Sequence, residues 1–108
     1  MKTFTVNTPY STYEDCYFVT GNYMADNSLS IQIWNDEDGP IADMTRCLCD
    51  AKKGFSYLDM NNCPWSRELV ERLGIGTFTG QVSMSGFCTY PLYEFDMAKI
   101  KEYSKKRR

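Results

Sequence analysis

The stretch that decides the fold is SLSIQIWNDEDGPIADMTRCLCD, residues 28–50. At its start Leu29, Ile31 and Ile33 alternate with residues of the opposite face, and successive side chains of a β-strand point to opposite faces. The turn formers NDEDGP follow, and IADMTRCLCD then resumes as the second strand of a hairpin. The stretch therefore predicts an antiparallel sheet, with two cysteines near the end of a strand.

Further short strands are expected on both sides of this hairpin. Apolar residues alternate with polar ones in short runs, which is the period of a strand. The predicted strands cover residues 4–6, 17–21, 55–60, 77–87 and 88–95. After them, DMAKIKEYSK is typical of a C-terminal helix over about residues 96–105, with Asp96 as its N-cap.

The period of the apolar residues becomes helical in the segment NNCPWSRELVERLGIG. Pro64 suits the first position of a helix, and Leu69 and Leu73 recur one turn apart. Gly74 can adopt the left-handed conformation that ends a helix. We therefore expect a central helix over about residues 64–73 and, with the strands, an α+β fold.

Length and composition indicate one packed domain over residues 1–108. The chain has 43% hydrophobic and 24% charged residues, which is ordinary for a globular protein. It contains neither a signal-peptide pattern nor an apolar run of about 20 residues, the length of a membrane span. We expect a cytoplasmic protein without a membrane partner.

The net charge of −2 is unevenly distributed along the chain. Residues 99–108, KIKEYSKKRR, carry six Lys or Arg and one Glu, a charge of +5, which leaves −7 for residues 1–98. An acidic body is repelled by nucleic acid and attracted to basic protein grooves, so direct nucleic-acid binding is not expected. The basic tail, residues 104–108, is the one segment that suits phosphate contacts.

Five cysteines and the lack of histidine restrict the possible metal and thiol chemistry. A structural zinc site without histidine needs four thiolates, and Cys47, Cys49, Cys63 and Cys88 are the candidate ligands. Their spacing, C-x-C-x13-C-x24-C, is not that of a common zinc finger. Buried free thiols and a disulfide or redox pair are the alternatives.

Catalysis by a cysteine has one candidate, Cys63, because it lies at the predicted start of a helix, where thiol pKa values are lowered. A nucleophilic cysteine normally needs a general base, most often histidine, and the chain has none. We therefore expect a protein that is not an enzyme.

Carboxylates gather in and after the predicted turn. Their charges could imitate phosphates and enter a basic channel of a partner protein, although a solvated face is the default explanation. The candidate partner-binding residues are Asp36, Glu37, Asp38, Asp43, Asp50 and Asp59.

Three motifs together carry a family resemblance. SLSIQIWNDEDGPIADMT, NNCPW and SGFCTYPLYEFD resemble a family of small uncharacterised domains carried by phages and other bacterial mobile elements, over about residues 27–96. Cys63 and Cys88 fall inside these motifs. Cys47 and Cys49 fall outside them, so a four-cysteine site would belong to this member and not to the whole family.

The resemblance has functional implications. The chain is also similar to a zinc-containing anti-CRISPR protein that acts on the RNA-guided DNA nuclease of type II systems. This implies an inhibitor that binds the nuclease, blocks loading of target DNA and carries a structural zinc. The alternative is a small nucleic-acid-binding accessory protein of a mobile element that uses its basic tail.

Overall fold

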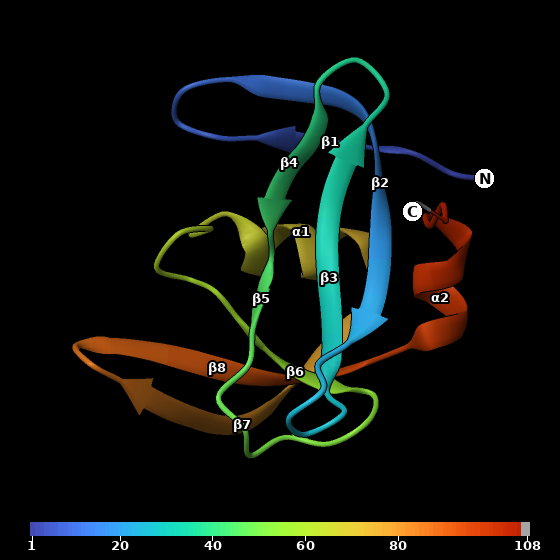
Figure 1. Cartoon of the computed structure of the whole chain (residues 1–108). Helices are drawn as coiled ribbons and strands as arrows, with labels where there is room; N and C mark the ends of the chain where they lie inside the picture. The colour runs from blue at the N-terminus through green and yellow to red at the C-terminus, as the bar shows by residue number, and fades with distance from the viewer. Residues whose placement is uncertain (107–108) are drawn as a thin grey trace.

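The computed structural model describes residues 1–106 and confirms the α+β class: two four-stranded antiparallel sheets with two short helices (Figure 1). The first sheet has the order β1 (Phe4–Asn7), β2 (Thr12–Asn22), β3 (Leu29–Asn35), β4 (Gly39–Asp43). The second has the order β5 (Thr45–Arg46), β6 (Phe55–Leu58), β8 (Cys88–Phe95), β7 (Gly76–Ser85). The helices are α1 (Ser66–Leu73) and α2 (Met97–Glu102).

The predicted hairpin forms, but its second half divides between the sheets. β3 pairs with β4 up to Asp43, and β5 then pairs with β6. Met44 lies at the crossing, where its N–H donates to the Ile31 carbonyl and its own carbonyl accepts from the Asp59 N–H, both at 2.9 Å. The side chain of Met44 is fully buried. The second strand of the predicted hairpin therefore divides between two sheets, which are joined at the buried Met44.

The main core lies where the first sheet, α1 and one face of the second sheet meet. The alternation in β3 is confirmed, because Leu29, Ile31 and Ile33 are all buried in this core. Leu69 and Val70 bury the apolar stripe of α1 against it. Burial of each such side chain contributes about 1.5–3 kcal/mol relative to exposure.

A second, smaller cluster covers the other face of the second sheet. Tyr57, Tyr90 and Leu92 form its buried part, and Leu48 and Ala51 pack against them. Side chains alternate across a strand, which is why Tyr90 and Leu92 of β8 join this cluster while Tyr93 and Phe95 join the main core. The segment that begins with the two cysteines of TRCLCD therefore covers a sheet face.

Each helix differs from the sequence prediction at one of its two ends. α1 starts at Ser66 and not at Pro64, because the Cys63 and Ser66 N–H groups donate to the carbonyls of Asp59 and Cys63 in successive turns. Gly74 ends α1 in the left-handed conformation, with φ of 65°, as predicted. α2 is only six residues long, although Asp96 does cap it by accepting from the Lys99 N–H. Within residues 1–106 no helix is long and apolar enough to cross a membrane.

Candidate functional site

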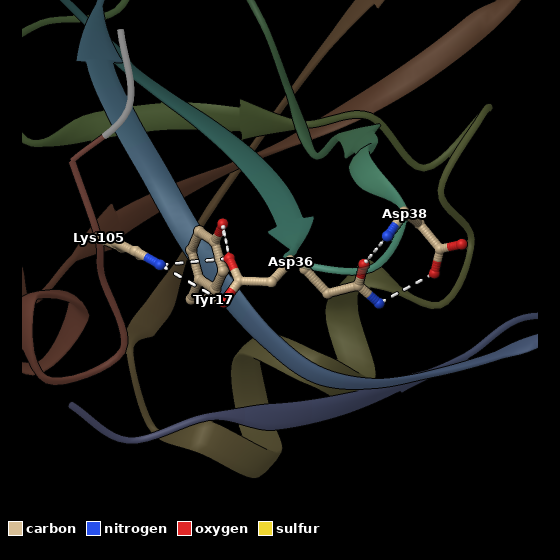
Figure 2. A network of polar contacts seen from close by, with 5 residues as sticks. Tyr17, Asp36, Asp38 and Lys105 are labelled. Atoms are coloured by element: carbon tan, nitrogen blue, oxygen red, sulfur yellow. Dashed lines mark hydrogen bonds and ion pairs between the residues drawn. The ribbon is translucent and has the colours of Figure 1, made fainter.

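The acidic turn between β3 and β4 is held in one shape by Asn35. This side chain is buried, its Oδ1 accepts from the Asp38 N–H at 2.6 Å, and its Nδ2 donates to Asp38 Oδ2 at 3.0 Å (Figure 2). The same Nδ2 donates to the Glu14 carbonyl of β2 at 3.3 Å. Asp36, Glu37 and Asp38 are exposed on this turn. Three of the predicted partner-binding residues therefore lie together on a preformed surface.

Asp36 connects this turn to the basic tail. Its Oδ1 accepts from the Tyr17 hydroxyl at 3.0 Å and lies 3.2 Å from Lys105 Nζ (Figure 2). The ammonium group also lies 5.1 Å from the centre of the Tyr17 ring. The backbone brings these groups together, because the Lys105 N–H donates to the Phe18 carbonyl at 3.0 Å. Sequence reasoning missed Tyr17 and this pair, since the contacts span 19 and 69 positions along the chain.

Two further carboxylates extend the acidic turn into a cleft. Glu14 and Asp15 of β2 line a concave surface of about 370 Å³ together with Glu37 and Asp38. Thr12, Tyr13 and Asn35 complete its lining. We call this surface the acidic cleft. No periodic signal in the sequence distinguishes Glu14 and Asp15, because only the pairing of β2 with β3 places them beside the turn.

The other three predicted acidic residues lie away from the acidic cleft. Asp43 is exposed and accepts from Gln32 Nε2 at 2.9 Å, and Asp50 is exposed in the segment after β5. Asp59 is buried, and its carboxylate accepts from the Asn62 N–H and Nδ2 at 3.2 and 2.9 Å. Asp59 therefore stabilises a turn, and we omit it from the proposed contact surface.

Two of the four predicted zinc ligands lie side by side. Cys47 Sγ and Cys49 Sγ are 3.9 Å apart. Zn–S bonds of about 2.3 Å in tetrahedral geometry place sulfurs about 3.8 Å apart, so this pair suits two ligands of one ion. Cys49 lies in the segment after β5 and adopts a φ of 66°, which is uncommon outside glycine.

The remaining two predicted ligands lie elsewhere. Cys63 is buried, and its thiol donates to the Asp43 carbonyl at 3.4 Å. Cys88 begins β8 and is half-buried against the second cluster. Among residues 1–106 no group of three or more Cys, His, Asp or Glu side chains is placed to hold a metal ion. The structure therefore gives the four-thiolate site no support, and zinc stays a prediction.

The surroundings of Cys63 do not favour a thiolate. Burial, with smaller contributions from Asp59 and Asp43, raises the pKa of its thiol to about 11. A neutral thiol is a poor nucleophile. The sequence predicted a lowered pKa for Cys63, because it placed this residue at the N-terminus of a helix. In the structure α1 begins three residues later.

Asp26 holds the cysteine segment in place. Its Oδ1 accepts from the Ser28 N–H and hydroxyl at 2.9 and 2.6 Å, and its Oδ2 accepts from the Ala51 N–H at 3.1 Å. Cys47 Sγ lies 3.7 Å from Oδ1. Burial acts to raise the pKa of Asp26, but the hydrogen bonds outweigh it and lower the pKa overall.

Comparison with known proteins gives one match. Neither a curated protein nor a solved structure matches the chain. A family described as "Domain of unknown function (DUF4313)" matches residues 18–107, which include both sheets apart from β1 and the start of β2. The predicted kinship with a family of small uncharacterised domains is confirmed at this level. The chain belongs to the family of domains of unknown function DUF4313.

Proposed function

We propose that this protein is a phage or mobile-element inhibitor that binds the RNA-guided DNA nuclease of a type II CRISPR system and blocks loading of target DNA. It would act in the cytoplasm of the bacterial host. The observation that carries the proposal is the acidic cleft, where Glu14, Asp15, Glu37 and Asp38 line one preformed concavity. The motif resemblance supplies the identity of the partner.

Charge is the physical basis of this binding. Nucleases of this class hold their nucleic acids in a positively charged channel. Clustered carboxylates on a rigid turn are complementary to such a channel and accelerate encounter by about 10- to 1,000-fold at low salt. The Asn35 hydrogen bonds support the proposal, because a turn that is already ordered loses little conformational entropy on binding.

The alternative is a nucleic-acid-binding accessory protein that uses the basic tail. One cation of the tail, Lys105, is paired with Asp36 and lies over the Tyr17 ring. One positive charge of the tail is therefore paired with a carboxylate of the acidic turn within the same protein. This contact favours the inhibitor, while Arg107 and Arg108 lie outside the described residues.

A cleavage assay tests the inhibitor directly. The double variant Glu14→Gln/Glu37→Gln removes two charges from the acidic cleft without changing side-chain size. The matched control, Glu71→Gln/Glu94→Gln, removes two charges from exposed positions on α1 and β8. We expect the cleft variant to need at least about tenfold more protein for half-inhibition, and the control to match the wild type.

Three outcomes would contradict the proposal or part of it. If a purified type II nuclease cuts its target at a large excess of the protein, the inhibitor proposal fails for that nuclease. If the protein alone shifts DNA in a gel, and deletion of residues 104–108 abolishes the shift, the accessory function is favoured. Equal inhibition by both double variants would remove the acidic cleft from the interface.

A further inference from the structure

The hairpin of β7 and β8 presents an open edge. In the order β5-β6-β8-β7, strand β7 has a neighbour on one side only within the described part of the chain. Figure 1 shows this hairpin projecting to one side, with its tip away from both helices. Its apolar side chains near the tip are exposed: Val82 by 53%, Met84 by 73% and Phe87 fully.

The edge backbone near the tip has hydrogen-bonding groups that point outward. The register Ser85↔Cys88 leaves a two-residue turn that starts with Gly86 at φ of 62°, and such turns close on a hydrogen-bonded pair. Hydrogen-bonded and non-bonded pairs alternate along antiparallel strands. The N–H and C=O groups of Val82 and Met84 therefore point away from β8.

Near its tip, the β7 edge lacks the features that normally stop an exposed edge strand from pairing with another chain. Edge strands are normally blocked by charged residues, especially lysine, by proline or by a bulge. Residues 73–93 contain no Asp, Glu, Lys or Arg at all. The one bulge of β7, between Phe78 and Val82, lies at Gly80 and leaves the four residues before the turn in regular register.

We propose that two copies of this chain associate through β7, which pairs antiparallel with its counterpart over Val82–Met84. An antiparallel edge is complementary to itself under a two-fold axis, so each copy donates and accepts the same hydrogen bonds. Val82 of one copy then lies opposite Met84 of the other, and these exposed apolar side chains are covered together.

Charge directs a second copy to this hairpin and gives a basic partner no anchor on it. Residues 1–98 carry −7, so two copies repel each other wherever carboxylates face one another. The uncharged hairpin is the surface where this repulsion is smallest. A basic partner would gain nothing there, because the hairpin offers no carboxylate. The inference is independent of the proposed inhibition, which uses the acidic cleft.

Sedimentation velocity over about 1–500 µM tests the pairing, because small interfaces give micromolar or weaker affinities. We expect the wild-type mass to rise from 12.5 kDa toward twice that value. Val82→Lys/Met84→Lys places two charges at the edge and should remain at the monomer mass throughout. Thr89→Lys is the matched control, since Thr89 is exposed opposite Met84 but lies on the inner strand of the hairpin.

Hydrogen exchange locates the contact independently of these variants. The amides of Val82 and Met84 should exchange more slowly at the high concentration than at the low one. A wild-type mass of 12.5 kDa at every concentration would overturn the proposal. So would a dimer that the folded double lysine variant retains, or amide protection at some other segment only.

Discussion

Replacement of Asp26 by alanine should release the segment that carries Cys47 and Cys49. The carboxylate joins the end of the β2–β3 connection to the segment after β5, because it accepts from both the Ser28 N–H and the Ala51 N–H. In Asp26→Ala, the Ser28 N–H and hydroxyl lose their acceptor although Ser28 is buried. Ala51 can recruit water, because it is only half-buried.

The expected loss of stability follows from these contacts. A hydrogen bond to a charged group contributes about 1.5–3 kcal/mol, and a buried donor left without a partner costs about 1–3 kcal/mol. The contributions overlap, so we expect the free energy of unfolding to fall by about 2–4 kcal/mol. Urea denaturation with a slope of about 1.5 kcal/mol/M would then show a midpoint lower by about 1–3 M.

A matched control and a pH series make the test specific. Glu37→Ala removes a carboxylate from an exposed turn and should change stability by less than about 0.5 kcal/mol. The folded pKa of Asp26 is lowered, so its contribution is present above the unfolded value of about 3.9 and is lost as pH falls through the folded pKa. The free energies of unfolding of the wild type and of Asp26→Ala should therefore converge as pH falls through the folded pKa. A loss at neutral pH no larger than that of Glu37→Ala would refute the reasoning.

Three further predictions concern a helix end, the thiols and zinc. Gly74→Ala should lower the free energy of unfolding in urea by about 1–2 kcal/mol, because alanine is strained at the φ of 65° found there. Gly21→Ala should not, because a Cβ at position 21 meets no other atom. Iodoacetamide at pH 8 should modify the exposed Cys49 before unfolding and the buried Cys63 only after it, as read by mass spectrometry; early modification of Cys63 would contradict its raised pKa. The four-thiolate prediction expects about one zinc per chain in elemental analysis after purification without added metal, and a content near zero would refute it.

The local elements could be predicted from the sequence because their signals are local. The alternation of Leu29, Ile31 and Ile33 identifies a buried strand face, and Gly74 identifies a helix end. The start of α1 was wrong by two residues, because turns held by backbone hydrogen bonds precede Ser66. Secondary-structure propensity does not predict such turns, since any residue except proline can supply both the N–H and the C=O group.

The candidate site was only partly predictable for the same reason. Asp36, Glu37 and Asp38 are adjacent in the sequence, so their clustering was visible. Glu14 and Asp15 join them only through the pairing of two strands. Likewise, Cys47 and Cys49 lie 3.9 Å apart because they are near neighbours in the sequence, while Cys63 is buried and donates to the Asp43 carbonyl.

The sequence by itself determined the α+β class, the alternation of strand faces, the acidic turn and the division of charge, because these depend on neighbouring residues. Only the tertiary structure decided that the strands form two sheets joined at Met44, that Lys105 pairs with Asp36, and that β7 lies at an open edge. These features depend on which distant segments share hydrogen bonds and a core, and such long-range pairing leaves no periodic signal in the chain.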